Sequence, residues 1–562
     1  MSSRLLAIDV AQGERSTSLD SVGLFVFALV VRLALLPFAS QDTNDHALRV
    51  WIAWRWAEDP FFFLHGHWPP LHFFVLGTFL RVFHDPIVTP VLVQVAFGAL
   101  VPAVLYRFSL REWGDRWAAL AVGAAYALYP VAIRTSLEVL VQPLFGLCLA
   151  LGFVALSRAR EPGAGWRRAA VAGAVLGVAC LLRVEGWLLI PFFALTLWPR
   201  RKLIVVCGAV AALVPVLMML ANTLHYGNPL LPFTTVVDFE LNMAGRDNFT
   251  LLQHAEQVAR YVWLVVGGMT PLLALGCGLG ALGCLRRRER QAIWLLPALA
   301  MSAILLGSVA VGSTAPKMIY TEIVGLLLIP FLASFLRAPE FRRLSTTWAR
   351  GGLAALFGSM LVLLGVGLLR DLPDLRQHSR LLAAIPAVNG APNFPGQPTI
   401  DPLVPLVRAQ DGPGRGLIID TLGPPASYYL GWQSRFHPDR IYIPPVAPNA
   451  DLDEAVPAAR QPLRERLQPL QDSQPLILDD FLHAYCTGLL LLQPGSRFAG
   501  WLNYDGASGA NLHGIGLELQ EMARAPWPLP EDGRLRAPGV AATAPGELVL
   551  FRYTVPGCAA GG

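Results

Sequence analysis

Ionisable side chains stand at the ends of several long apolar runs of this chain. Asp42, Asp45 and His46 follow the first run, and others flank later runs: Arg134, Glu138, Arg183, Lys317 and Tyr320. Charged groups at membrane depth are costly and therefore tend to be functional. A carboxylate or histidine can accept a proton, and arginine or lysine can stabilise an anion. Because these groups come from separate segments and lie at similar depth, they predict a cavity at the outer leaflet that several segments build together.

Each of these residues also has a structural interpretation. An Asp just after a membrane helix is most often a solvated cap, and Arg183 with Glu185 would form an interfacial anchor pair. Lys317 would extend to the headgroups. His65, His67 and His72 suggest a metal site as one alternative. The other alternative is contact with lipid headgroups, which is more common for histidine beside Trp and Pro at a membrane interface. We therefore predict no metal ligands, and the need for a divalent metal stays open.

The elements that must position these residues are membrane helices. Hydrophobic residues make up 54% of the 562 residues and charged residues 15%, against about 25% charged in soluble chains. Runs long enough to cross a bilayer core of about 30 Å predict about eleven spans, near 21–39, 87–106, 117–133, 137–157, 169–186, 187–198, 203–221, 261–284, 291–311, 318–336 and 351–369. Residues 67–84 begin with Trp-Pro-Pro and predict an interfacial helix instead.

The placement of positive charge predicts the orientation. Alternate loops hold 18 Lys/Arg in 45 residues, and the opposite loops hold 8 in roughly 100. Because basic loops stay on the cytoplasmic side, residues 1–20 should be cytoplasmic, and the first long loop, 40–86, exoplasmic. We expect a multi-pass protein of the plasma (inner) membrane. No basic-aromatic pattern for nucleic acid appears.

The chain changes character after the last run. Residues 371–562 are rich in Pro and charge, and strand-like pieces at 416–420, 440–445, 475–480 and 547–555 alternate with stretches such as 452–470 that favour helix. We predict an all-α membrane domain over 21–370, followed by an exoplasmic α/β domain. Cys486 and Cys558 lie in this tail and would pair in an oxidising compartment, or stay reduced.

The order of these features resembles a known family. Asp45-His46 is followed by Pro69-Pro70-Leu71, and then come Glu138 in SLEVLVQPLF, Arg183 in LLRVEGWLLIP, HYGNPLLPF (225–233) and Lys317 in APKMIYTEIVGLLLIP. Together they resemble the GT-C superfamily of polyprenyl-phosphate-sugar glycosyltransferases, in the branch of protein O-mannosyltransferases and the lipid A aminoarabinose transferase. The resemblance covers about residues 20–370. It departs where His46 replaces the family's usual Glu and where Lys317 replaces an Arg.

The resemblance implies inverting sugar transfer from a polyprenyl-phosphate-sugar to a lipid, glycan or protein acceptor at the exoplasmic face. Asp45 would be the general base, with Asp42 as second choice. Arg183, Lys317 and, less directly, Arg134 would bind the donor phosphate. The residues expected to orient the acceptor or the base are His46, Glu138, His67 and Tyr320.

Two functions from other classes remain open at this point. A lipid-linked saccharide flippase or transporter would also place charges within helices, but near the midplane and on repeated or broken helices. A membrane assembly protein without catalysis would leave Asp45 replaceable. No cofactor is predicted beyond the lipid-linked sugar itself.

Overall fold

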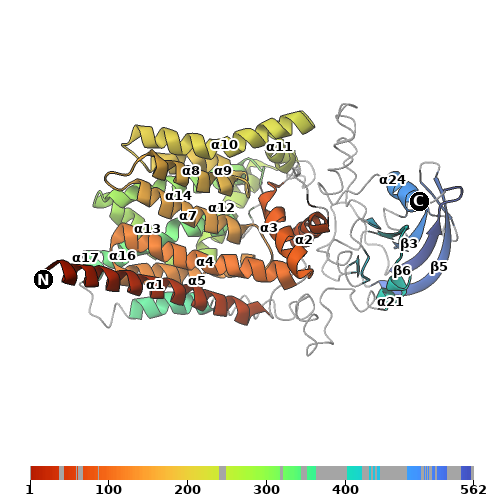
Figure 1. The fold of residues 1–562 in the computed structure, drawn as a ribbon, viewed down its shortest axis with the longest axis horizontal. Coiled ribbons are helices and arrows are strands. Elements are labelled where there is room, and N and C mark those ends of the chain that lie inside the picture. Colours follow the sequence, from red (N-terminus) through yellow and green to blue (C-terminus); the bar gives the residue numbers. More distant parts are fainter. Residues whose placement is uncertain are drawn as a thin grey trace.

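The structure is a computed structural model in which a helical domain holds the N-terminus at one end and a mixed sheet lies beyond its other end (Figure 1). It describes residues 2–36, 44–58, 60, 68–86, 88–238, 249–314, 316, 320–342 and 351–362 of the helical part. In the C-terminal part it describes 402–420, 430–431, 434–436, 440–442, 478–494, 499, 502, 504, 509–512, 515–527 and 546–558.

The helical domain begins with α1 (Ser2–Leu35), α2 (Asn44–Glu58), α3 (Leu71–Phe83) and α4 (Val88–Trp113). Next come α5 (Arg116–Ala127), α6 (Pro130–Leu137), α7 (Gln142–Ala159), α8 (Trp166–Cys180), α9 (Glu185–Leu195), α10 (Arg201–Tyr226) and α11 (Leu231–Asp238). The domain continues with α12 (Leu251–Met269), α13 (Pro271–Arg286), α14 (Leu295–Ala310), α15 (Thr321–Leu328), α16 (Leu332–Arg337) and α17 (Pro339–Arg342).

Several of these helices are long and apolar enough to cross a membrane. Within the described residues five helices meet this condition, or up to seven if each of two bent pairs counts as one span. The protein is therefore a multi-pass membrane protein, and the count of about eleven stays a prediction. The number of long helices is smaller than the number of predicted spans partly because some spans are broken. In the run 117–133, Pro130 starts a new helix, with a bend of 47° between α5 and α6.

The segment predicted to be interfacial forms α3, a helix of 13 residues. At 1.5 Å per residue it is about 20 Å long, too short to cross a bilayer core. Gly77 on α3 faces the ring of Trp56 so closely that a Cβ there would collide with it. This glycine lets α3 pack directly against α2, although the depth of the pair in a bilayer stays a prediction.

An apolar cluster joins the helical domain to the C-terminal domain. Val50 and Trp51 of α2 belong to it together with Ile133 of α6, and so do Leu417 and Leu489 of the sheet. A Cβ on Gly431 would lie 3.7 Å from the Trp51 ring. The C-terminal domain therefore packs onto α2, at the end of the helical domain opposite the N-terminus (Figure 1).

The C-terminal domain is built on a six-stranded mixed sheet in the order β2-β1-β3-β6-β5-β4. The strands are β1 (Arg415–Ile419), β2 (Ile441–Tyr442), β3 (Thr487–Leu492), β4 (Gly509–Leu512), β5 (Ile515–Trp527) and β6 (Gly546–Thr554). β1 pairs in parallel with β2 and β3, and β6 is antiparallel to both β3 and β5. Two short helices, α21 (Leu403–Arg408) and α24 (Leu478–Ala484), accompany the sheet.

Three of the four predicted strands correspond to β1, β2 and β6. The fourth prediction, 475–480, is wrong over Leu478–Asp480, which begin α24. The strand in this part of the chain is β3, which follows α24 and is also an apolar run. The prediction therefore took the start of the helix for the strand. The helix expected over 452–470 lies outside the described residues.

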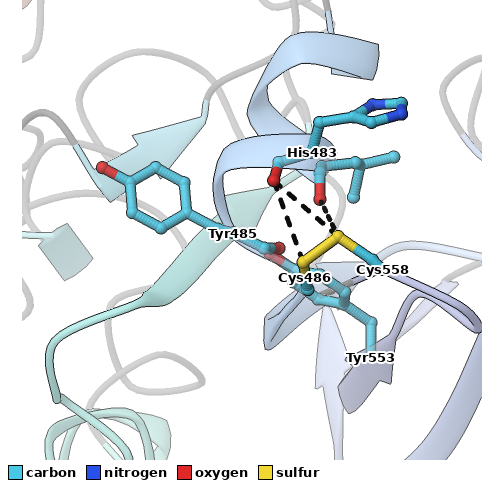
Figure 2. The surroundings of a disulfide bond; sticks show 6 residues. His483, Tyr485, Cys486, Tyr553 and Cys558 are labelled. Atoms are coloured by element: carbon cyan, nitrogen blue, oxygen red, sulfur yellow. Dashed lines mark hydrogen bonds between the residues drawn. A yellow bond between two sulfur atoms is a disulfide. The ribbon is translucent and has the colours of Figure 1, made fainter. Parts of the chain in front are cut away.

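Cys486 and Cys558 form a disulfide, with Cα atoms 5.6 Å apart, a separation typical of such bonds. Figure 2 shows the bridge beside His483, Tyr485 and Tyr553. It ties the start of β3 to the chain just after β6, where the Tyr553 hydroxyl also donates a hydrogen bond to the Tyr485 carbonyl (2.9 Å). Of the two alternatives that the sequence left open, the structure has the paired one.

Candidate functional site

Arg183 lies in the short connection between α8 and α9. Its guanidinium donates two hydrogen bonds to the Glu185 carboxylate, one of them from Nε to Oε2 at 3.1 Å. It also lies over the Tyr320 ring, 5.3 Å from the ring centroid. Both charged side chains are largely buried, at 11% and 17% exposed. The structure thus brings together two predicted site residues from distant segments, Arg183 and Tyr320, and contains the pair of Arg183 with Glu185 that the sequence offered as an interfacial anchor.

The Pro-Pro-Leu motif contacts the same connection. The backbone N–H of Leu71, at the start of α3, donates to the Leu181 carbonyl at 3.1 Å. This bond places the α8–α9 connection at the end of the helical domain where α3 lies, which is the end facing the sheet (Figure 1). Two motifs that are far apart in the sequence therefore belong to one locus.

The start of α15 is held against α5 and α6 by hydrogen bonds. The Glu322 carboxylate accepts from the Tyr126 hydroxyl (2.9 Å) and from the Thr135 hydroxyl (2.6 Å). The Tyr129 hydroxyl donates to the Thr321 carbonyl at 3.0 Å. Because Tyr320 directly precedes these residues, the network fixes the ring on which Arg183 stacks.

Arg32 connects α1 to this network. The side chain is fully buried, and its Nε donates to the Ser136 hydroxyl at 3.2 Å. Gly98 of α4 leaves the space for it, because a Cβ at that position would collide with the Ser136 side chain and touch Arg32. Arg32 and Arg183 both lie within electrostatic range of Glu322. The two guanidiniums thus favour the charged form of the Glu322 carboxylate, and the carboxylate offsets part of their positive charge.

Arg134 and Glu138 form a second pair, at the C-terminal end of α6. The Arg134 Nε donates to the Glu138 carboxylate at 2.5 Å. Here only the acid is buried, because the arginine side chain is 53% exposed and the acid 5%. Arg134 is the neighbour of Thr135 in the α6–α15 network, so this pair lies at the edge of the same locus.

The helix α2 carries Asp45 and His46 in its first turn. One turn later, Arg49 is buried and lies over the Trp68 ring, 4.3 Å from its centroid. Since α2 also packs with Ile133 of α6, the Asp45 helix borders the α6–α15 network.

Several predicted site residues fall outside what the structure describes. Asp42, His67 and Lys317 lie outside the described residues, and of Asp45 and His46 only the backbone, in α2, is described. His72 is buried on α3 and pairs with Gln94 of α4. Among the described residues no three His, Cys, Asp or Glu side chains are grouped to hold a metal ion.

Sequence reasoning missed Arg32 and Arg49, and it placed Glu322 beside Lys317 and Tyr320 among the charged groups at the ends of the helices without giving it a chemical role. Arg32 had a visible signal, because it interrupts the apolar run FVFALVVRLALLPF, and an ionisable residue inside such a run is a functional candidate in itself. Glu322 follows Tyr320 by two residues, but its partners on α5 and α6 depend on tertiary contacts. Arg49 is recognisable only from its position one turn after Asp45.

Comparison with known proteins agrees with this architecture. Residues 67–226 match the family described as dolichyl-phosphate-mannose-protein mannosyltransferase. No curated protein sequence matches the chain.

Among solved structures, the chain is similar to ArnT from Cupriavidus metallidurans bound to undecaprenyl phosphate, with a TM-score of 0.58 at 15% identity over 94% of this chain and 97% of that chain. The apo state of the same protein gives 0.57 at 16% identity, with the same coverage. A weaker likeness, 0.45 at 13% identity over 75% and 64% of the two chains, is to an oligosaccharyltransferase from Archaeoglobus fulgidus. The expected resemblance to the GT-C superfamily, in the ArnT and mannosyltransferase branch, is confirmed in the fold.

Proposed function

Starting from this GT-C fold, we propose that the protein is a membrane glycosyltransferase that uses a polyprenyl-phosphate-sugar donor. One observation carries the proposal: Arg183 and Tyr320 meet at the same end of the helical domain as α2, the helix whose first turn contains Asp45. The undecaprenyl phosphate bound to ArnT, a protein of the same fold, supports a lipid phosphate as ligand. The acceptor would be a hydroxyl or amine on a lipid, glycan or protein.

The reaction is a displacement at the anomeric carbon of the donor sugar. The acceptor oxygen or nitrogen forms a bond to that carbon from the face opposite the phosphate, and the bond from carbon to phosphate oxygen breaks, which inverts the configuration. The Asp45 carboxylate takes the proton from the acceptor. The electron pair of the broken bond leaves on the polyprenyl phosphate, whose negative charge must be stabilised.

Arg183 is suited to receive that charge. Its planar guanidinium already binds two oxygens of Glu185, and a phosphate offers the same two-oxygen geometry. Glu185 compensates the buried positive charge of Arg183, and the donor phosphate would bind the same guanidinium. Lys317 and Arg134 would add positive charge from their own segments, while Glu138, His46, His67 and Tyr320 would orient the acceptor or the base.

Purified protein in lipid nanodiscs, incubated with a panel of polyprenyl-phosphate sugars and candidate acceptors, tests the proposal. We expect one donor to release polyprenyl phosphate in step with formation of the glycosylated acceptor. No release from any donor, with protein that still binds polyprenyl phosphate, would contradict glycosyl transfer.

A flippase for lipid-linked saccharides is the second candidate, because one described span is bent by 47° beside the buried Glu322 and Arg32. Bent helices with buried charges are typical of transporters. In proteoliposomes a flippase would move the labelled donor across the bilayer and leave its sugar bond intact, whereas the transferase would cleave that bond.

We further propose that the site and the C-terminal domain both face the exoplasm, and that the N-terminus is cytoplasmic in the inner membrane. The bias of 18 against 8 basic residues between the two sets of loops supports this orientation. A reporter fused after Arg287 should be cytoplasmic and one fused after Pro398 exoplasmic. Reporters on the same side would contradict the orientation.

A further inference from the structure

A cavity of about 480 Å³ opens at the end of the helical domain remote from the sheet. It lies between the last turn of α4, the last turn of α7 and the first residues of α8, and its lining includes Arg111, Arg158, Arg167, Arg168, Glu161 and Val171. The α7 helix runs 18 residues from the region of α6 to this cavity, which is about 27 Å. The cavity is therefore separate from the Arg183 locus.

Its charge is strongly unbalanced. Four arginines face one carboxylate. Glu161 is already shared, because it pairs with Arg111 and, at 2.5 Å, with Arg168. Arg158 and Arg167 are exposed, and among the described residues no carboxylate forms an ion pair with either. These two guanidiniums are available to an anion from outside.

The surroundings place this anion site at the level of lipid headgroups. Arg111 and Arg158 end two of the helices that are long and apolar enough to cross a membrane. Trp166, 62% exposed, stands beside Arg167, as aromatic side chains do at membrane interfaces. Deeper along the helices, Leu151 and Val171 are exposed at 42% and 59%. Positive charge thus lies directly above an exposed apolar surface.

We propose that this cavity binds an anionic phospholipid, with its phosphate diester on Arg158 and Arg167 and its acyl chains along Leu151 and Val171. Basic pockets between membrane helices are suited to such headgroups. The apolar side chains favour a lipid over free phosphate, which shares the charge but has no chains to bury. This site would be independent of the proposed transferase activity, because it lies at the other end of the domain.

Native mass spectrometry of the purified protein, titrated with phosphatidylglycerol or with phosphatidylcholine, tests the proposal. We expect one phosphatidylglycerol to bind in clear preference to phosphatidylcholine. Arg158→Gln with Arg167→Gln should weaken that binding by about 10- to 30-fold, given the usual contribution of a basic residue near an anionic lipid. Neither substitution breaks an ion pair of the described residues, so folding should be retained, as a melting curve would verify.

The matched control is Arg286→Gln with Arg288→Gln. It removes the same charge from exposed arginines at and just beyond the end of α13, outside the cavity, and should leave lipid binding unchanged. Equal binding of the two lipids, or equal losses in the two double variants, would overturn the proposal. Displacement of the lipid by millimolar inorganic phosphate would also overturn it, because the site would then be one for a free anion.

Discussion

The two ends of the helical domain use similar residues in opposite ways. At the end facing the sheet, Arg183 and Glu322 are buried and each is held by partners from other segments. At the far end, Arg158 in the last turn of α7 and Arg167 in the first turn of α8 are exposed. Burying a charged side chain costs free energy, so such a residue is retained mainly where a functional site needs it. An exposed basic residue costs little free energy, and it can contribute to membrane orientation and lipid contact. Substitutions at the first end should therefore change turnover, and those at the second should not.

The largest effect is expected at Asp45. Asp45→Asn keeps the shape of the side chain but cannot accept a proton, so sugar transfer should fall by about 10²–10⁴, the usual contribution of a general base. Single-turnover transfer to a known acceptor is the measurement, with binding of polyprenyl phosphate as a check on folding.

Two controls sharpen this test. Asp42→Asn should do much less, and a reversed order would move the base to Asp42. Asp85→Asn changes an acid of the same loop that caps α4 (2.9 Å to the Val88 N–H), a bond that Asn can also accept, and should leave transfer intact. Full activity of the Asp42, Asp45 double variant would remove the catalytic role from both.

The next effect is expected at Arg183. Arg183→Ala removes the charge that meets the departing phosphate and should lower kcat/KM by about 10²–10³, as for loss of a preorganised oxyanion donor. Arg81→Ala, an exposed arginine in the last turn of α3, is the control and should retain wild-type turnover. Equal, normal rates in both variants would make Arg183 an interfacial anchor, no different from the arginines at the far end.

Glu322 should act on stability more than on chemistry. Glu322→Ala leaves the Tyr126 hydroxyl without its acceptor, removes the shorter of the two hydrogen bonds of the Thr135 hydroxyl and removes the carboxylate near Arg32, at an expected cost of about 3–5 kcal/mol. Glu322→Gln keeps an acceptor and should lose less than half of that. Thermal inactivation in detergent measures both. If Glu322→Ala were as stable as wild type, the network would not hold α15 in place.

The smallest effect is expected at Arg134. Its pair with Glu138 is half exposed, and such pairs contribute about 1 kcal/mol or less, so Arg134→Ala should change turnover by no more than about fivefold. If Arg134→Ala lowered turnover as much as Arg183→Ala in the same assay, Arg134 would contact the donor phosphate directly. The Arg134–Glu138 and Arg183–Glu185 pairs would then have the same role.

Much of the fold was predictable because it depends on local pattern. Apolar runs and the Pro-rich change after residue 370 predicted the helical domain and the α/β domain, and short strand-like pieces separated by stretches that favour helix predicted β1, β2 and β6. The error at 475–480 has the same origin: PLILDD and TGLLLL are both apolar, and the pattern alone does not tell which one pairs with β1.

By itself the sequence determined which residues carry charge, at which ends of the apolar runs, and in what order, because hydropathy and the positions of Arg and Glu are local properties. Only the tertiary structure decided that Arg183 lies on Tyr320, that Glu322 joins α15 to α6, and that Arg32 reaches Ser136. These contacts span up to 187 positions of the chain. Their partners are selected by packing and by the need of each buried polar group for a hydrogen bond, and neither can be read from spacing along the chain.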